Sequence, residues 1–262
     1  MEALNQEDKQ RIILQHRIGL LHFKPLAGSK MTIGLAIIGL ISAFATAIII
    51  WPHYCVRLIS SRSNRITWMG SGDRNYVALT IDDGPDPVYT PQILDILATK
   101  GIKATFFVVG DRALRYPDII KRICAEGHQI GNHTGSWKRT IFLGQRQFEN
   151  DLDATSVGLG SLPCATKFFR PAGIWIRSKQ LQAVRDRGYR CVLGSAYAYD
   201  PARPPSRYIA WAIGRGLRPG AIAVIHDSGG DRSATAAALP GIIVAAKRKN
   251  LKFVLLSELL DQ

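Results

Sequence analysis

The stretch Leu79-Thr80-Ile81-Asp82-Asp83-Gly84-Pro85 decides the fold class of this chain, because it joins an apolar run to a polar turn. Residues 76–81, "YVALTI", are mostly β-branched, aromatic or aliphatic and predict a buried strand. Two adjacent carboxylates, Asp82 and Asp83, follow where that strand ends. Successive residues that leave a strand point in different directions, so one carboxylate can bind a cation while the other stays free as a base.

The chain after residue 75 repeats this alternation of short strands and longer helices. Further strand-like runs cover residues 104–109, 129–131, 167–170, 191–193, 221–225 and 253–255. Helices are predicted between them, over residues 91–100, 116–126, 147–158, 178–187, 206–216 and 234–249. Such alternation is typical of an α/β domain with a parallel sheet. We therefore predict that residues 76–262 form a deformed (β/α) barrel of about seven parallel strands, smaller than the eightfold form of about 250 residues.

An uncharged segment precedes this domain. Residues 31–51, "MTIGLAIIGLISAFATAIIIW", contain no charged side chain over 21 positions. A helix of that length, rising about 1.5 Å per residue, can cross a hydrocarbon core of about 30 Å. The sequence predicts one transmembrane helix here, an N-terminal tail at 1–30 and a linker at 52–75. A cleaved export signal is the alternative, Met31 could be the true start, and basic residues on both flanks leave the orientation open.

The composition is that of a folded, strongly basic protein. Hydrophobic residues make up 47% of the chain, and 34 Lys and Arg against 20 Asp and Glu give a net charge of +14. This charge favours an anionic partner such as a phospholipid surface or an acidic cell-wall polymer. The basic residues are scattered, and no helix-turn-helix, RNP-like or Cys/His finger motif is present, so no nucleic-acid partner is expected.

The cysteines are far apart in the sequence and form no C-x-x-C pair; they are Cys55, Cys124, Cys164 and Cys191. This spacing argues against a structural zinc site. We expect them to be small buried hydrophobic side chains. A disulfide between Cys164 and Cys191 is an alternative in an oxidising compartment.

Ionisable side chains follow several of the predicted strands. Besides Asp82 and Asp83 they are His133, Arg170, Asp200 and His226. In (β/α) barrels the reactive groups lie at the C-terminal ends of the strands, on one face. Each residue has an ordinary explanation on its own, since Asp-Gly-Pro is a common turn and a lone histidine is usually structural. Their joint placement at successive strand ends favours an active site.

Ordered blocks from residue 77 to the C-terminus resemble the NodB-homology polysaccharide deacetylases, a family of carbohydrate esterases that includes chitin and peptidoglycan deacetylases. "LTIDDGPDPVYT" (79–90) resembles the family's T-F-D-D-G-P block, and "KATFFVVG" (103–110) resembles its second strand. "GHQIGNHT" (127–134) is similar to the start of its metal block, "FRPAG" (169–173) to its Arg-Pro block and "AIAVIHDS" (221–228) to its final His block. The resemblance implies the barrel fold and hydrolysis of the N-acetyl groups of a polysaccharide, which are non-peptide C–N bonds.

The resemblance also implies catalytic and metal-binding roles, residue by residue. Asp83 and His133 would bind a divalent metal, which is usually zinc in the family, with manganese or cobalt as alternatives. Asp82 would be the general base that activates water, and Arg170 would orient it. His226 would protonate the departing amine. The chemistry agrees, because a metal lowers the pKa of water from 15.7 towards about 7, and histidine, with an unperturbed pKa of about 6.5, suits the acid.

Three further residues take expected roles around the substrate. The resemblance implies that the backbone N–H of Gly173 faces the developing oxyanion and that Val224 lines the pocket for the acetyl methyl group. Asp200 is a candidate for raising the pKa of His226, although the family's fourth block is poorly matched around it. A plain Asp-Pro turn is an equal alternative for Asp200.

One position departs from the family pattern. The family's metal block places a second histidine four residues after the first, and this chain has Trp137 there. An indole N–H is a donor with no lone pair for a metal. His128 is no substitute, because five residues of strand at about 3.3 Å each would place it about 16 Å from His133. A site of Asp82, Asp83 and His133 with waters would be rich in carboxylate and weaker for zinc.

Two functions from different classes follow. The first is a metal-dependent hydrolase that deacetylates an N-acetylated envelope glycan, held by a single-pass membrane anchor at 31–51 with its domain on the extracytoplasmic side. The second is a catalytically impaired glycan-binding protein of the same fold, in which Trp137 stacks on a sugar ring. The retained ionisable residues favour the first.

Overall fold

The computed structural model describes residues 28–50 and 65–261. Contacts divide the chain into two units, Met1–Ala47 and Ile48–Gln262. Helix α2, Gly28–Ile50, covers most of the segment predicted to enter a membrane, whereas Trp51 and Cys55 lie outside the described residues. Among residues 28–50 and 65–261, no helix combines the length and the hydropathy required to span a membrane. The transmembrane helix therefore stays a prediction.

The rest of the described chain is built around one parallel sheet. Its eight strands run in the order β5-β4-β3-β2-β1-β7-β6, with β8 paired to β1 beside that path. Every strand pairing is parallel. The strands are β1 (Tyr76–Asp82), β2 (Thr105–Val108), β3 (Gln129–Asn132), β4 (Ala165–Phe169), β5 (Arg190–Cys191), β6 (Ala196–Tyr197), β7 (Ile222–His226) and β8 (Lys252–Val254).

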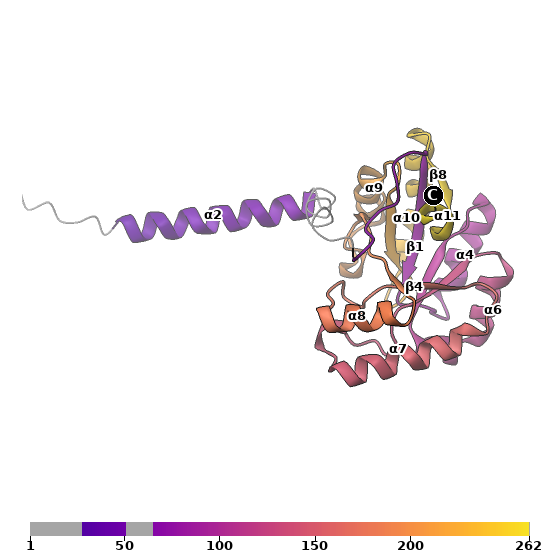
Figure 1. The fold of residues 1–262 in the computed structure, drawn as a ribbon. Helices are drawn as coiled ribbons and strands as arrows, with labels where there is room; N and C mark the ends of the chain where they lie inside the picture. The colour runs from indigo at the N-terminus through magenta and orange to yellow at the C-terminus, as the bar shows by residue number, and fades with distance from the viewer. Residues whose placement is uncertain (1–27, 51–64, 262) are drawn as a thin grey trace, which may run out of the picture. The chain divides into compact units, whose positions relative to one another are not determined.

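Strand β1 is the centre of the sheet because it is apolar on both faces. All of its residues after Tyr76 are buried, which is typical of a parallel strand covered by helices on both sides. It pairs with β7 on one edge, and with β2 and, nearer its start, β8 on the other. Figure 1 shows β1 inside the domain, with α4 and α6 on one side of it and α8 and α9 on the other.

The helices between the strands end where the sequence provides stop signals. Helix α4 is followed by Gly101, whose φ of 63° is left-handed, and α6 begins with Pro117 in its first turn; both are common at helix ends. The helices are α4 (Tyr89–Lys100), α5 (Gly110–Arg115), α6 (Pro117–Ala125), α7 (Gln145–Gly160), α8 (Ser178–Asp186), α9 (Ser206–Gly216), α10 (Ser233–Arg248) and α11 (Leu256–Leu260), with 3-10 turns η2 (Thr140–Phe142) and η3 (Asp200–Ala202).

The structure confirms the predicted deformed (β/α) barrel as a curled parallel sheet surrounded by helices. It differs from the prediction in one strand and in how the sheet closes. Strand β6, Ala196–Tyr197, was not predicted, because two residues are too short to show a periodic pattern. The sheet does not close on itself between its edge strands β5 and β6. Instead, the segment before β1 bridges that side, where Thr67 pairs with Val192 and Met69 with Ala221.

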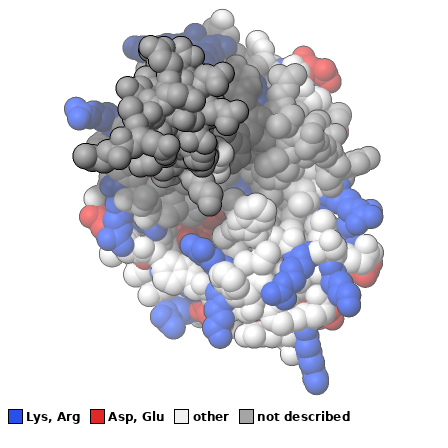
Figure 2. All heavy atoms as spheres, turned by 90° about the vertical axis from the view of Figure 1, so that its left-hand side faces the viewer, with Lys and Arg blue, Asp and Glu red and all other residues white. Residues whose placement is uncertain are grey.

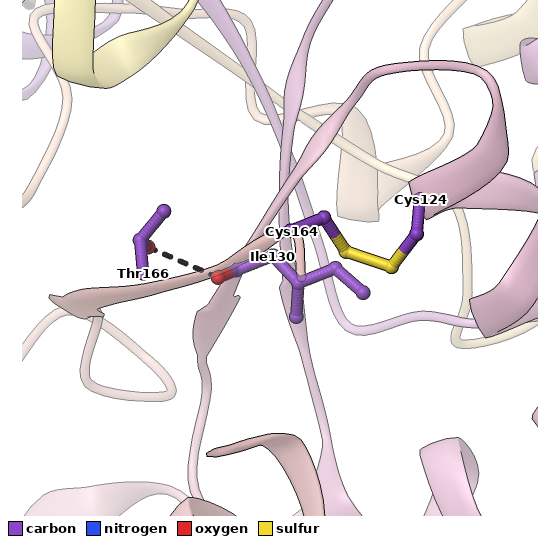
Figure 3. The surroundings of a disulfide bond; sticks show 4 residues. All are labelled: Cys124, Ile130, Cys164 and Thr166. Carbon is purple, nitrogen blue, oxygen red and sulfur yellow. Dashed lines mark hydrogen bonds between the residues drawn. A yellow bond between two sulfur atoms is a disulfide. The ribbon is translucent and has the colours of Figure 1, made fainter. Parts of the chain in front are cut away.

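The disulfide in the structure joins Cys124 and Cys164, so the predicted alternative of a Cys164–Cys191 bond is wrong. Figure 3 shows the bond from the end of α6 to the start of β4, beside Ile130 of β3. Cys191 is free and buried. It lies opposite Phe169 at the far end of β4, whereas Cys164 precedes that strand. A disulfide needs Cα atoms less than about 7 Å apart, and a strand of this length separates the two cysteines by more.

Removing this disulfide is expected to destabilise the domain. The bond closes a loop with a sequence separation of 40 residues, and the loss of that cross-link costs about 4 kcal/mol in the chain-entropy model. The double variant Cys124→Ala/Cys164→Ala should therefore unfold at a temperature about 8–16 °C lower in a calorimetric scan. Cys191→Ala serves as the control, and the difference between wild type and double variant should vanish in reducing buffer. Alkylation of both Cys124 and Cys164 without prior reduction would contradict the pairing.

Candidate active site

The C-terminal ends of the parallel strands form one face of the sheet, here called the site face. Asp82 ends β1 and His226 ends β7, and their Cα atoms are register partners. His133 follows β3 and Arg170 follows β4. Asp200 begins η3, which follows β6. The topology therefore brings together side chains that the sequence spreads over about 150 positions.

Arg170 and Asp82 form a buried ion pair on this face. Arg170 Nη1 donates to Asp82 Oδ1 at 2.7 Å, and both side chains are almost fully buried. The guanidinium also donates to Thr80 Oγ1 and to the carbonyls of Val192 and Leu193. A buried charge pair is stable only when its remaining hydrogen-bonding groups are satisfied. Here β1 and the segment after β5 satisfy Arg170, so the Asp82 carboxylate is held in one orientation.

Asp200 and His226 form a second pair, beside the first. His226 Nδ1 lies 2.9 Å from Asp200 Oδ1, and the His226 backbone N–H donates to Asp200 Oδ2 at 2.9 Å. Burial acts to lower the pKa of His226, but the carboxylates of Asp200, Asp83 and Asp82 outweigh it and raise that pKa to about 9. At neutral pH the imidazole is therefore protonated and can donate a proton.

Asp83 and His133 lie in direct contact. His133 Nε2 is 3.3 Å from Asp83 Oδ1, and His133 Nδ1 is 2.8 Å from the carbonyl oxygen of Arg170. A carbonyl only accepts, so Nδ1 carries a proton and Nε2 faces the carboxylate. Burial acts to raise the pKa of Asp83, but His133, His226 and a hydrogen bond from Trp137 lower it to about 2. Asp83 is thus a carboxylate at any ordinary pH.

Trp137 contributes a hydrogen-bond donor where the family pattern has a metal ligand. Its side chain hydrogen-bonds to Asp83. The guanidinium of Arg112 lies over its ring, 5.6 Å from the centroid, and its ring edge lies against Gly229, where a Cβ would be only 2.7 Å away. Gly229 also has a φ of +89°, a conformation that side chains other than glycine rarely adopt. The chain is therefore packed around an indole at this position.

Unusual backbone conformations cluster at the loops of the site face. Asp83 and Thr134 have φ angles of 77° and 74°, and Thr134 is β-branched, for which positive φ is an outlier. Its conformation is fixed by a bond from its N–H to Asn132 Oδ1 at 2.8 Å and by Gly110 N–H donating to its carbonyl at 2.9 Å. Strained residues that the surroundings hold in place are common at functional sites.

The family is decided by comparison with known proteins. Residues 70–192 match a family model described as polysaccharide deacetylase. The peptidoglycan-N-acetylglucosamine deacetylase of Bacillus cereus is 36% identical over 198 residues, which cover 74% of this chain and 92% of the relative. The chain belongs to the polysaccharide deacetylase family. The predicted family resemblance is confirmed, and curated members of this family are named as deacetylases.

Solved structures of this family include both an enzyme and a pseudoenzyme. The chain is similar to the Bc1960 peptidoglycan N-acetylglucosamine deacetylase, with a TM-score of 0.73, 32% identity and coverage of 78% of this chain and 96% of that one. It is also similar to BA3943, a pseudoenzyme of carbohydrate esterase family CE4 from Bacillus anthracis, with a TM-score of 0.70, 25% identity and coverage of 76% and 70%. A mutant of BA3943 has restored enzymatic activity. Membership of the family therefore does not decide the activity of this deacetylase-family chain.

A divalent metal, which the family implies, fits two side chains of this site. The Asp83 oxygen and the His133 Nε2 converge, and the Arg170 carbonyl holds the other ring nitrogen, as is usual for metal-binding histidines. Among the residues that the structure describes, no group of three or more His, Cys, Asp or Glu is placed to hold a metal. The donor set thus fits a cation bound by two protein ligands with water in the other positions. It does not fit a site with three protein ligands.

The remaining predicted residues occupy the following places. Gly173 has a φ of +75° in the loop after β4 and contacts the Arg139 side chain. Val224 lies on β7, with its side chain against Gly194. His128 is buried at the start of β3, at the opposite end of that strand from His133, where its Nδ1 accepts the Ala104 N–H at 3.0 Å. The predicted roles of Gly173 and Val224 stay predictions.

Two buried residues that support the site face were missed from the sequence. Arg232 is buried and donates to the carbonyls of Ser228, Gly229 and Asp200. It thereby fastens the loop after His226 to the backbone of Asp200. Thr235 donates to Asp200 Oδ2 at 3.2 Å. In the sequence, "GGDRSAT" (229–235) has the composition of a polar turn, so no pattern distinguishes these residues from solvated ones.

Asp227 is a further buried carboxyl group behind the Asp83 turn. It accepts a hydrogen bond from Thr90 Oγ1 at 2.5 Å, and burial raises its pKa to about 7. Both Asp227 oxygens lie within 2.5 Å of the position that a Cβ on residue 84 would take. The glycine of the Asp83-Gly84-Pro85 turn is therefore required by this contact.

Proposed function

We propose that this chain is a hydrolase that removes N-acetyl groups from an N-acetylated polysaccharide or envelope glycan. The observation that supports this most is the pair of preorganised groups at the ends of β1 and β7. Asp82 is oriented by Arg170, and His226 is held protonated beside Asp200. Amide hydrolysis needs a base for water and an acid for the leaving nitrogen, at close range and in opposite protonation states.

The residues act in a defined order in this proposal. Asp82 accepts a proton from the attacking water as its oxygen bonds to the acetyl carbonyl carbon. The C–N bond then breaks, His226 donates its proton to the amine nitrogen, and acetate is released. A cation bound by Asp83 and His133 would lower the pKa of water and polarise the carbonyl oxygen. Zinc, manganese and cobalt are the candidate ions, and a site with two protein ligands is expected to bind each of them weakly.

We also propose that the domain is held at a membrane by residues 31–51 and lies on the extracytoplasmic side. The uncharged length of that segment supports the anchor. The Cys124–Cys164 disulfide supports an oxidising compartment, which is where envelope polysaccharides are found. The test is a reporter enzyme fused after Gln262. If the reporter is active only in the cytoplasm, this location is wrong.

A glycan-binding pseudoenzyme is the second candidate, and Trp137 is the observation that favours it. This side chain is 52% exposed although it hydrogen-bonds to Asp83. An exposed indole face can stack on a sugar ring. The similarity to BA3943, a pseudoenzyme, is in line with this alternative.

Acetate release distinguishes the two candidates. The full chain is incubated with N-acetylglucosamine oligomers, with and without added Zn²⁺, Co²⁺ or Mn²⁺, and its metal content is measured in parallel. Release of acetate above the background of a His226→Gln variant is expected for the hydrolase. Binding of the oligomers with no release under any metal condition would reject the hydrolase and support the pseudoenzyme.

The proposed acid predicts a pH dependence that Asp200 sets. A folded pKa of about 9 keeps the His226 imidazole protonated below that pH and lets it lose the proton above it. Acetate release should therefore decline on the alkaline side near pH 9. In Asp200→Asn the largest source of the raised pKa is lost, and the decline should move towards about 6.5. At pH 8 the protonated fraction would fall about 30-fold, and the rate with it. An unchanged alkaline limb in Asp200→Asn would contradict the role of His226.

A further inference from the structure

Three stretches that begin at the site face contain basic residues and no acidic ones. Residues 133–148, 171–185 and 201–218 include no Asp or Glu. They follow β3, β4 and β6 and lead into α7, α8 and α9. The exposed cations at their site-face ends are Lys138, Arg139, Arg146, Arg177, Lys179, Arg203 and Arg207. Arg203 interacts electrostatically with Asp231, and the other six are here called the basic rim. Figure 2 faces the side on which α8 lies in Figure 1, and Lys and Arg outnumber carboxylates over the lower part of that view.

The basic rim is not neutralised within the described part of the chain. None of its members forms an ion pair within 4.0 Å with a described carboxylate. The guanidinium of Arg177 donates to the carbonyl of Leu143 at 3.3 Å and to no carboxylate in the described part of the chain. The carboxylates Asp86 and Asp231 belong to other loops of the site face, where Arg112 and Tyr89 respectively contact them. Clustered cations of this kind raise the local concentration of an anionic ligand.

Large apolar side chains stand exposed among these cations. Trp137, Phe142 and Trp175 are 52%, 75% and 65% exposed, and each belongs to one of the first two acid-free stretches. Sugar rings present apolar C–H faces that pack on aromatic side chains, and anionic groups between the rings can pair with Arg and Lys. A surface with both features at the entrance to the acid and base matches a charged glycan better than a neutral one.

We propose that the basic rim binds anionic groups along an N-acetylated polysaccharide, so that the preferred substrate class is an acidic glycan. This inference rests on the proposed function for taking a glycan as the ligand. An anionic lipid surface is the competing partner. The glycan is favoured because the cations lie on three separate loops of the face that carries the Asp82 and His226 pairs, where a chain bound to those pairs would pass.

The test compares two quadruple variants of the full chain. The rim variant changes Lys138, Arg146, Lys179 and Arg207 to glutamine. The control variant changes Lys100, Arg185, Lys247 and Arg248 to glutamine, which are exposed residues in the last turns of α4, α8 and α10. Both lose the same charge, so net charge alone cannot separate them. Binding is measured to hyaluronan, to an uncharged N-acetylglucosamine oligomer and to phosphatidylglycerol vesicles.

The rim variant is expected to bind hyaluronan at least about tenfold more weakly than wild type at low salt, and the control variant less than about twofold. Binding of the uncharged oligomer should change in neither. An equal loss of hyaluronan affinity in both variants would overturn the inference. So would wild-type protein that binds the uncharged oligomer more tightly than hyaluronan. If the rim variant loses binding only to the phosphatidylglycerol vesicles, the inference is also wrong, because the basic rim would then bind a membrane surface. Rim-dependent hyaluronan binding without acetate release from any glycan would support the inference while rejecting the proposed function.

Discussion

Replacing Trp137 by histidine is expected to raise the affinity of the site for Zn²⁺ by at least about 100-fold. The variant removes the indole donor that hydrogen-bonds to Asp83 and supplies a ring nitrogen with a lone pair beside Asp83 and His133. Loss of groups outside the ligand shell alone costs about 10–100-fold in metal affinity, so a gained ligand should exceed that. The measurement is a competition titration against a zinc-binding dye with the full chain.

Trp137→Phe is the matched control for this experiment. It removes the indole N–H and keeps an aromatic ring against Arg112 and Gly229, but it offers no lone pair. Its zinc affinity should stay within a few-fold of wild type, because the net free energy of one hydrogen bond corresponds to a change of about that size. If Trp137→His binds zinc no more tightly than Trp137→Phe, then residue 137 is not placed as a ligand and the two-ligand description of the site is wrong.

Replacing His226 by glutamine is expected to lower acetate release by about 10²–10⁴-fold, the usual contribution of a positioned general acid. Glutamine can donate a hydrogen bond to Asp200, but it cannot give up a proton at neutral pH. The rate is measured as acetate released from N-acetylglucosamine oligomers. Thermal unfolding of the same preparation shows whether the variant is folded.

His128→Gln is the control for this second substitution. His128 is also buried, but it lies at the opposite end of β3 from the site face, and glutamine can still accept the Ala104 N–H. The variant should release acetate at the wild-type rate at temperatures where it is folded. Comparable rates for wild type and His226→Gln above the no-protein background would show that His226 is not the acid.

Much of this fold was predictable because it depends on local sequence. The run at residues 76–81 is apolar enough to be buried on both faces, and β1 forms there. Helix α9 begins and ends at the predicted residues, Ser206 and Gly216. Strand β6 and helix α5 were missed, since they are too short for a hydrophobic period to show.

The candidate site divides in the same way. The ionisable residues at the strand ends could be predicted to lie together, because parallel strands place their C-terminal ends on one face. For Asp200 the sequence left two alternatives open, a contact with His226 and a plain Asp-Pro turn. The residues of such a turn do not indicate which side chain the carboxylate will contact. The clamp formed by Arg232 was not predictable, because its three carbonyl partners come together only when the loop after β7 packs against η3.

Three features follow from residue type and local spacing alone: the alternation of strands and helices, the ionisable residues at the strand ends and the absence of a lone pair at Trp137. Three others are visible only in the folded domain: Cys124 pairs with Cys164, Asp200 bonds to His226, and the indole of Trp137 donates to Asp83. These contacts join segments far apart in the chain. Their partners are selected by packing and by the need to satisfy buried polar groups, which no local pattern records.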